Sequence, residues 1–301
     1  MKMPNPTITN SSYSGEFAGK YLGAALLSAK TLDEGAITIL PNIKYKAAMK
    51  VGAFTDLVRS ADCDFDSTTS GLTLTEKVLT PTELQVNLQI CKKELHADWE
   101  AAQMGFSAFD ELPPLFSDYV IARVAAEVAK ATEVSIWSGS AGEGSFNGFT
   151  TELSGDGTVV DVAAGGAIDA TNVVAKLGAV VDAIPSGVYG KEDLTIYISQ
   201  NIAKAYISAQ AALGYRELYN VGQTEMNFQG IKLFTTGGLG DNTAVAAQAS
   251  NLFFGTGLLD DRNEVKVIDM ADLDGSQNVR VVMRYTAGIQ YGIGSDIVLL
   301  S

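Results

Sequence analysis

PPLFSDYVIARVAAEVAKATEVSIW, residues 113–137, has the pattern of a single long amphipathic helix. Proline disfavours helical backbone in the residue before it, so Pro113-Pro114 places the expected start of the helix at Leu115. Charged side chains occupy the outer faces, while one face is apolar and includes Val120, Val124 and Val128. At about 1.5 Å per residue, residues 115–137 would extend over roughly 34 Å, which is long enough to cross a whole domain.

The helix pattern ends in a glycine- and serine-rich segment, SGSAGEGSFNGF, residues 138–149. This composition predicts a flexible hinge after a rigid helix. Trp137, Phe146 and Phe149 could form an aromatic platform for nucleic acid, but no basic residues alternate with them. We therefore expect the three aromatic side chains to pack around the hinge.

The overall composition limits the class of protein. With 301 residues, 47% hydrophobic and 19% charged, the chain has the composition of a globular protein with one large or two modest domains. The net charge of −14, without a basic cluster, argues against tight nucleic-acid binding, which depends on Lys and Arg. No run approaches about 18 apolar residues, so we expect neither a secretion signal nor a membrane span. Cys63 and Cys91 fit no metal or disulfide pattern and are expected to be free thiols.

The N-terminal third predicts an arm followed by a projecting excursion. Residues 1–15 are polar, and residues 16–29 have the pattern of a short helix. Two strand-like segments, 43–51 and 72–78, flank the polar stretch 60–71, which has the composition of a loop tip. Because such a pair of strands buries little of itself, we expect the excursion to pack on something else.

The remaining pattern predicts an α+β region around a sheet. The expected helices are 93–104, 170–184 and 200–213. The expected strands are 86–90, 194–199, 231–235, 252–255, 265–269 and 279–285, and the last strands, up to Leu300, are expected to return to the core beside the long helix.

No group of residues predicts catalysis. His96 is the one histidine and lies at no metal-ligand spacing, so we expect it on a helix surface. Gly237–Asp241 follows a strand, but no helix pattern begins after it, which favours a turn over a phosphate-binding loop. The many serines have no base at a spacing typical of a nucleophile. We therefore expect neither an enzyme nor a cofactor.

Two acidic clusters could hold a hard cation through their carboxylates. They are Asp260, Asp261 and Glu264, and Asp269, Asp272 and Asp274. The second cluster lacks the complete twelve-residue calcium-loop pattern, so we expect solvated loops and no metal. An unrelated α+β enzyme stays open as an alternative, and it would need a deep pocket lined by the first cluster.

In the order of its expected elements, the chain resembles the major capsid proteins of tailed bacteriophages, whose fold is shared with encapsulin shells. AKATEVSIWSGS (129–140) followed by FNGF (146–149) is similar to that family's helix end and glycine-rich exit, and NLFFGTG (251–257) resembles its last axial strand. The resemblance implies an α+β fold with an N-terminal arm, an extended two-stranded loop at about 43–88, a long spine helix in a peripheral domain, and an axial α+β domain. The implied parts are the arm and short helix (1–34), the extended loop and its base strands (35–92), the peripheral domain (93–164) with spine helix 115–137, the axial domain (165–262), and strands returning to the peripheral domain (263–301).

The resemblance also implies a function. The chain would be a structural protein that self-assembles into hexamers and pentamers of an icosahedral shell, enclosing phage double-stranded DNA without binding it specifically. Other copies of itself, a separate scaffolding protein and a portal would be its partners, and the virion capsid its location after assembly in the host bacterial cytoplasm. A small bend at the hinge, between the two domains, would let one sequence fit pentamers and hexamers. An encapsulin-like shell holding cargo enzymes is the alternative within the same fold.

Contacts between subunits follow from the same resemblance. Loop 270–278 would meet neighbours near three-fold axes. The implied contact residues are Lys44, Lys46 and Lys50 at the base of the extended loop, where ordinary salt bridges are expected, Phe54, Asp64 and Asp66 further along it, and Asp272 and Asp274 in loop 270–278. Some relatives cross-link their subunits through a lysine and an asparagine, but no position here matches, and we carry no cross-link over to this chain.

Overall fold

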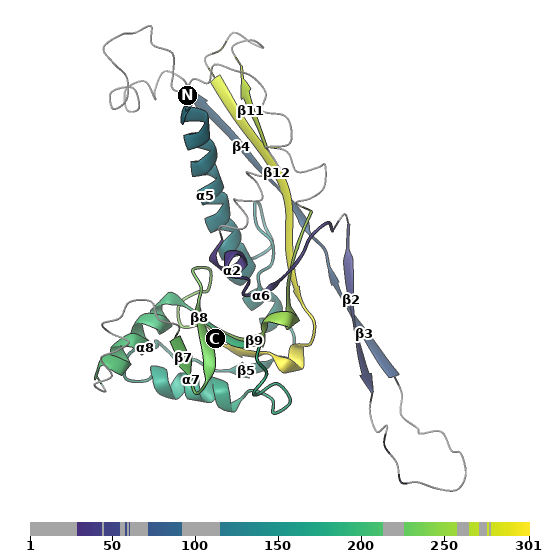
Figure 1. Ribbon diagram of the computed structural model, residues 1–301, viewed down its shortest axis with the longest axis vertical. Coiled ribbons are helices and arrows are strands. Elements are labelled where there is room, and N and C mark those ends of the chain that lie inside the picture. The colour runs from purple at the N-terminus through teal and green to yellow at the C-terminus, as the bar shows by residue number, and fades with distance from the viewer. Residues whose placement is uncertain are drawn as a thin grey trace.

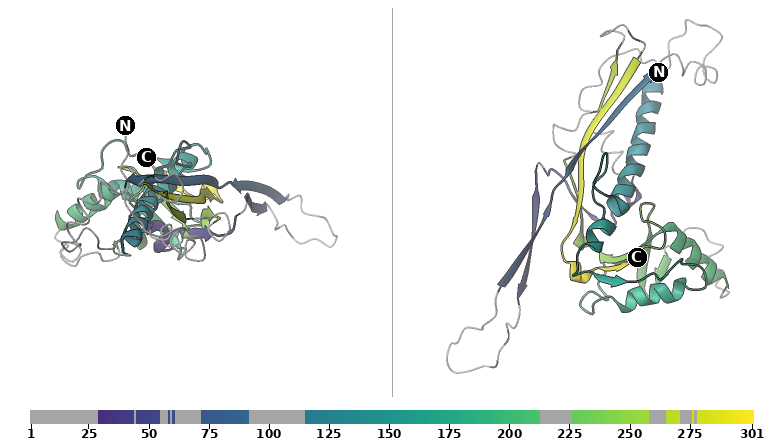
Figure 2. Two further views of the ribbon diagram at one scale, coloured as in Figure 1. Left: turned by 90° about the horizontal axis from the view of Figure 1, so that it is seen from above. Right: turned by 180° about the vertical axis from the view of Figure 1, so that it is seen from behind.

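The computed structural model describes residues 29–43, 45–54, 58, 60, 72–91, 115–212, 226–257, 265–270, 276 and 278–301. These residues form an elongated molecule with three parts: a five-stranded sheet beside a long helix, a compact six-stranded sheet with two helices, and a projecting hairpin (Figure 1). Seen from behind in Figure 2, the long helix again runs beside the five-stranded sheet, and the hairpin points away from the body. The expected α+β class is confirmed.

The long helix is α5 (Leu115–Ser138), one residue longer than predicted. Its 24 residues correspond to about 36 Å at a rise of about 1.5 Å per residue. Val128, Ile136 and Trp137 are buried, and Val124 is partly buried against the same core, as the apolar pattern predicts. The other helices are α2 (Lys30–Asp33), α6 (Phe149–Ser154), α7 (Val173–Asp182) and α8 (Gln200–Ala212), with single 3-10 turns at Ala249–Asn251 and Gly294–Asp296.

The five-stranded sheet is organised around its longest strand, β12 (Asn278–Tyr291). One edge of β12 pairs antiparallel with β4 (Thr82–Cys91). The opposite edge pairs first with β11 (Val265–Asp269) and then with β10 (Leu252–Thr256). The short strand β1 (Thr38–Leu40) lies parallel to β10 and completes the sheet. Since β12 touches every strand except β1, this one strand holds the sheet together.

The six-stranded sheet has the order β5-β13-β9-β6-β8-β7. Its strands are β5 (Val160–Val162), β13 (Val298–Leu300), β9 (Ala244–Gln248), β6 (Leu194–Ile198), β8 (Ile231–Thr235) and β7 (Met226–Phe228). Figure 1 shows α7 and α8 in the same compact part. Buried side chains of both helices and of the sheet share one core cluster.

Alternate residues of the six-stranded sheet belong to two different cores. On β6, Leu194, Ile196 and Ile198 join the core shared with α7 and α8, while Tyr197 joins the core that contains the end of α5. β13 divides in the same way, since Leu299 faces the α5 core and its two neighbours face the other. Successive strand residues point to opposite faces, so the sheet separates the two cores.

The segment after α5 is a tightly packed turn. A Cβ atom on Gly139 would collide with the carbonyl oxygen of Phe146, and one on Gly148 would come within 2.6 Å of the backbone nitrogen of Gly139. The Gly148 N–H donates to the Gly139 carbonyl at 2.8 Å, and the hydroxyl of Thr151 donates to the same oxygen at 2.7 Å. Gly139 and Gly148 are needed because two stretches of backbone touch, and a hinge at 138–149 stays a prediction.

The aromatic residues around this turn are buried, as expected. Trp137 and Phe149 are completely buried, and Phe146 is 4% exposed. The ring of Trp137 lies 5.4 Å from that of Phe149 and 4.8 Å from that of Tyr197 on β6. The last turn of α5 is thus joined to α6 and to the six-stranded sheet by direct ring contacts.

The sheets divide the chain differently from the expected domain boundaries. β10 falls in the segment expected to be axial, yet it lies in the five-stranded sheet because it continues along the same edge of β12 as β11. β13 was expected beside the long helix, but after the turn at Gly294–Asp296 it enters the six-stranded sheet between β5 and β9. The described strands of the projecting hairpin are 47–54 and 72–79, and the expected extent of 43–88 is too long because β4 belongs to the five-stranded sheet.

Candidate assembly surface

The hairpin formed by β2 (Ala47–Phe54) and β3 (Leu72–Leu79) projects away from the rest of the described chain (Figure 1). Its pairs run from Ala47 with Leu79 at the base to Phe54 with Leu72 at the outer end. Among the described strands, none pairs with the outer edge of either β2 or β3. A lone two-stranded ribbon is marginally stable in water, and an exposed strand edge is a template for pairing with another chain. The hairpin therefore has the properties of an element completed by a partner.

The side chains of the hairpin leave apolar surface uncovered. Val78 is 39% exposed, and Met49 and Val51 are only partly buried. Lys50 and Glu76 lie directly opposite each other and are both exposed, an arrangement of opposite charges that favours this register. The apolar side chains can lose further water-exposed area only by contact with another molecule.

The base of the hairpin sits on two glycines of the five-stranded sheet. Gly255 of β10 and Gly288 of β12 are direct cross-strand partners. A Cβ atom on Gly255 would collide with the side chain of Leu79, and one on Gly288 would lie 3.0 Å from the Cα of Pro81. Leu79 is completely buried there. The missing side chains thus let the hairpin base cross directly over the sheet.

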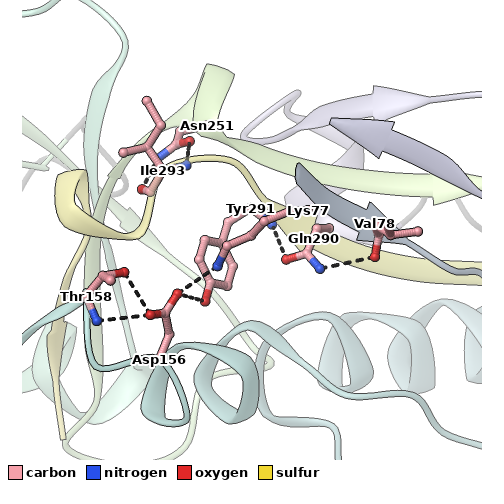
Figure 3. A network of polar contacts seen from close by, with 8 residues as sticks. All are labelled: Lys77, Val78, Asp156, Thr158, Asn251, Gln290, Tyr291 and Ile293. Carbon is pink, nitrogen blue, oxygen red and sulfur yellow. Dashed lines mark hydrogen bonds and ion pairs between the residues drawn. The ribbon is translucent and has the colours of Figure 1, made fainter. Parts of the chain in front are cut away.

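A charged contact holds the hairpin next to Gly255 and Gly288. Figure 3 shows Lys77 reaching from β3 to Asp156, with the ring of Tyr291 next to it. The Lys77 Nζ lies 2.7 Å from Asp156 Oδ2 and 3.6 Å from the centre of the Tyr291 ring. Tyr291 donates its hydroxyl to the same Oδ2 at 2.7 Å, and the backbone N–H and hydroxyl of Thr158 donate to Oδ1 at 2.9 and 2.8 Å. We call Lys77, Asp156 and Tyr291 the clamp.

The electrostatics of the clamp favour an ionised carboxylate. The Lys77 contact, followed by the hydrogen bonds from Tyr291 and Thr158, holds the pKa of Asp156 well below its usual range. Burial, and then the neighbouring carboxylate, raise the pKa of Tyr291, so its hydroxyl stays a donor. Because Tyr291 and Thr158 belong to the body, the carboxylate is already positioned to receive a cation from the hairpin.

Two further contacts extend this network to the end of β12 (Figure 3). The side-chain amide of Gln290 donates to the Val78 carbonyl at 3.3 Å and so adds a second polar link to the hairpin. Asn251 donates to the Ile293 carbonyl at 2.9 Å and accepts from the Ile293 N–H at 2.8 Å. This pair fixes the turn directly after β12, and with it the position of Tyr291.

Several of the predicted contact residues lie outside the described residues. These are Lys44, Asp64, Asp66, Asp272 and Asp274. Lys46 and Lys50 are exposed near the hairpin base, and the Nζ of Lys46 lies 5.3 Å from the centre of the ring of the exposed Tyr45. Phe54 ends β2, and only its backbone is described. The role of these residues in contacts between subunits stays a prediction.

The candidate cation sites are not assembled in the described chain. Asp269 ends β11, where its backbone pairs with Val279, but its two expected co-ligands are outside the described residues, as are His96 and the cluster around Asp260. Within the described ranges, no three His, Cys, Asp or Glu side chains gather in a way that could hold a metal ion. Gly237–Asp241 forms bends and a turn between β8 and β9, as expected. No described helix is both long and apolar enough to cross a membrane.

The clamp was missed from the sequence. No sequence pattern singles out Asp156, and Tyr291 lies among the last strands expected up to Leu300. Lys77 and Asp156 are 79 residues apart, and Asp156 and Tyr291 are 135 apart. The Gly155-Asp156-Gly157 sequence signalled a turn, but no local pattern connected that turn to the hairpin.

No family model matches the sequence, and a comparison with curated proteins also finds no match. The structure, in contrast, is similar to many solved structures. A chain of Gordonia phage Cozz has 12% identity and a TM-score of 0.61, with 100% of this chain and 99% of that chain covered. The capsid of Myoviridae phage XM1 has 15% identity and a TM-score of 0.55, with 98% and 95% covered. A virus-like particle from Pyrococcus furiosus has 11% identity and a TM-score of 0.55, with 95% and 100% covered. The chain therefore has the fold of these solved structures, and the expected phage capsid fold is confirmed.

Proposed function

We propose that this chain is the major capsid subunit of a tailed bacteriophage, which self-assembles into hexamers and pentamers of an icosahedral shell. The observation that carries the proposal is the hairpin of β2 and β3, which leaves two strand edges and partly apolar faces uncovered on a subunit with a capsid fold. A hairpin held rigidly away from its own body can reach a neighbouring copy. The clamp, together with the contact of the hairpin base with Gly255 and Gly288, would set the direction in which the hairpin projects.

The proposed contacts are heterologous, since the hairpin of one copy would lie on a different surface of the next. Such head-to-tail contacts generate closed rings when their rotation closes. Each contact can be weak by itself, because every copy in a closed shell is held by several neighbours at once. The exposed edges of the hairpin would then be covered in the shell and would no longer be available for non-specific pairing.

The charge of the subunit fits a container for DNA that does not bind its contents tightly. At −14, the subunit repels phosphate groups, except where basic side chains are locally concentrated. The shell would be assembled in the host cytoplasm with a separate scaffolding protein and a portal, and would become the capsid of the virion. Strong binding of double-stranded DNA by purified shells at moderate salt would contradict the low-affinity part of the proposal.

A cargo-holding shell is the second candidate, and the similarity to the Pyrococcus furiosus virus-like particle favours it specifically. Both candidates use the same assembly contacts and differ in what the shell encloses. Particles purified from cells expressing the chain with its neighbouring genes would contain enzyme cargo in one case and DNA in the other.

The assembly proposal is tested with two valines that have the same exposure in the single subunit. Val78 on the hairpin and Val174 on α7 are each 39% exposed. We expect wild-type protein, produced together with the proposed scaffolding protein, to form large particles in sedimentation and negative-stain microscopy. Val78→Asp should leave folded, unassembled subunits, whereas Val174→Asp should assemble normally. A wild-type monomer at every concentration, or assembly of Val78→Asp equal to that of Val174→Asp, would contradict the proposed role of the hairpin.

A further inference from the structure

Residues 29–40, which we call the strap, cross the region where α5 meets both sheets. The strap begins with Ala29 and α2; Ala29 and Leu32 belong to the core that contains the end of α5, and Thr31 is buried. It ends with β1, which pairs with β10 of the five-stranded sheet. Figure 1 shows α2 beside the C-terminal end of α5, above the six-stranded sheet. The strap therefore lies where α5, the five-stranded sheet and the six-stranded sheet come together.

Thr31 ties the strap to α5 through three hydrogen bonds. Its backbone N–H donates to Glu133 Oε2 at 3.1 Å, and its hydroxyl donates to Glu133 Oε1 at 2.6 Å. The same hydroxyl accepts from the indole Nε1–H of Trp137 at 2.8 Å. The exposed fraction is 0% for Thr31 and Trp137 and 7% for Glu133. One threonine side chain thus connects two successive turns of α5.

Glu133 depends on the strap for its hydrogen bonds. Both of its carboxylate oxygens accept from Thr31, and no lysine or arginine of the described chain forms an ion pair with it. A buried carboxylate that loses its donors is strongly disfavoured compared with one in water. If the strap left its site, Glu133 would have to move towards solvent and take the last turns of α5 with it.

The same turns of α5 are fitted closely against the six-stranded sheet. The carbonyl oxygen of Glu133 touches Gly238 so closely that a Cβ atom there would collide with it. The hydroxyl of Ser138 donates to the Gly238 carbonyl at 2.7 Å, and the Trp137 ring lies on Tyr197 of β6. A shift of this part of α5 would therefore open its contact with the six-stranded sheet.

The strap is also fastened to the six-stranded sheet directly. The Nζ of Lys30 donates to the Thr235 carbonyl at 2.8 Å, and the hydroxyl of Tyr197 donates to the Ala36 carbonyl. Tyr197 therefore contacts the strap with its hydroxyl and α5 with its ring. The strap, the end of α5 and the six-stranded sheet form one mutually dependent set of contacts.

We propose that the strap is a latch that fixes the angle between α5 and the six-stranded sheet, with Glu133 as its point of attachment on the helix. When the strap is docked, α5 has one orientation relative to the sheet. When it is undocked, Glu133 becomes hydrated and the helix end is released. This inference concerns the single subunit and goes beyond shell formation, so it can fail without affecting the proposed function.

The angle can be measured in the full-length chain as the distance between two spin labels. Ala126→Cys on the exposed side of α5 and Asp182→Cys at the exposed end of α7 supply the attachment sites, after Cys63 and Cys91 are replaced by serine. Labelled protein is diluted with unlabelled protein so that distances between copies do not contribute. We expect a single narrow distance distribution when Thr31 is present.

Thr31→Val keeps the shape of the side chain but removes the hydroxyl, so the undocked population should rise about tenfold or more and the distribution should broaden. Thr31→Ser retains the hydroxyl and should restore the narrow distribution. Thr38→Val is the matched control, because it removes another strap hydrogen bond, from the Thr38 hydroxyl to the Ala249 carbonyl, that does not involve α5. Its distribution should stay narrow.

All variants are compared below the onset of thermal unfolding, so that a general loss of stability does not imitate the effect. Glu133→Gln provides an independent variant if Thr31→Val does not fold, since it replaces one acceptor oxygen by a donor nitrogen and should also broaden the distribution. The inference is overturned if the distance distribution of Thr31→Val, or of Glu133→Gln in its place, is as narrow as that of wild type. Equal broadening in Thr31→Ser or in Thr38→Val would overturn it as well.

Discussion

Replacing Lys77 by methionine removes the cation of the clamp and keeps most of the side-chain volume. A hydrogen bond to a charged group contributes about 1.5–3 kcal/mol, and a cation over an aromatic ring about 0.5–1 kcal/mol at an exposed site. The side chains of Lys77 and Asp156 are 29% and 20% exposed, so solvent screening reduces the first value. In this variant Asp156 still accepts hydrogen bonds from Tyr291 and Thr158, so its carboxylate is not left without donors.

We therefore expect Lys77→Met to weaken the docking of the hairpin base by about 1–2 kcal/mol, which is a factor of about 5–30 in the undocked population. Hydrogen exchange of the backbone amides around residues 76–78 in the unassembled subunit measures this change. Their exchange should accelerate by the same factor, while the amides of β6 and β9 should not change. Removal of the cation should also raise the pKa of Asp156 towards its usual value, which NMR titration would show.

Lys50→Met is the matched control for this experiment. Lys50 is also a lysine of the hairpin and faces Glu76 across the strands, but it is exposed and is not part of the clamp. Its replacement should leave exchange at the base within a factor of about two, as expected for an exposed pair worth a few tenths of a kcal/mol. Exchange in Lys77→Met equal to that in Lys50→Met would refute the idea that the clamp holds the hairpin.

Three further predictions concern the clamp, the hairpin base and the junction of α5 with the six-stranded sheet. The folded-state pKa of Asp156 lies below its unfolded value of about 3.9, so its contribution to docking is fully present above the unfolded value and is lost as the pH falls through the folded-state pKa. The protection factors of the amides at the hairpin base, in which each measured exchange rate is corrected for the intrinsic rate at the same pH, should be constant from about pH 5 to 8, fall at lower pH, and lose this acid dependence in Asp156→Asn. Leu79→Ala leaves a cavity where the buried Leu79 side chain packs over Gly255, and it should destabilise hairpin docking by about 2–5 kcal/mol. The particle yield should therefore fall sharply. A particle yield equal to that of wild type would contradict this prediction. Gly238→Ala puts a methyl group against the carbonyl of Glu133 and should lower the thermal midpoint through about 1–3 kcal/mol of overpacking; an unchanged midpoint in calorimetry would show that the junction can relax.

Much of the fold was predictable from local patterns. The valine spacing and the two prolines predicted α5 to within one residue, and the strand patterns at 231–235 and 265–269 correspond to β8 and β11. These segments are long enough, or rich enough in branched apolar residues, for one face or both to be recognised.

Other elements carried weaker signals. β9, with the sequence AVAAQ, is buried along its whole length, but its alanines have little preference for strands, and the segment was not predicted. β5 and β7 have only three residues each, too few to show a period. Neighbouring strands supply the missing specificity, since β9 is held between β6 and β13.

The candidate site was predictable in outline only. The alternating segments around the polar stretch 60–71 predicted a projecting pair of strands, and β2 and β3 confirm it. The clamp joins residues from β3, from the turn after α6 and from the end of β12, and no local pattern can identify a contact between such distant segments. The close packing of the glycine-rich turn was not predictable for a related reason. A glycine pattern indicates conformational freedom, but at Gly139 and Gly148 glycine permits close approach of the backbone.

The position of β13 has a consequence for when the subunit can begin to function. Val298–Leu300 lies between β5 and β9, so these three residues join the strand that follows α6 to the rest of the six-stranded sheet. β9 is complete at Gln248, and the ribosome must add another 50 residues before Val298 is available. Until then the nascent chain has β5 and β9 unjoined and the α5 core without Leu299. Completion of the body is thereby delayed until the hairpin and α5 have long been synthesised.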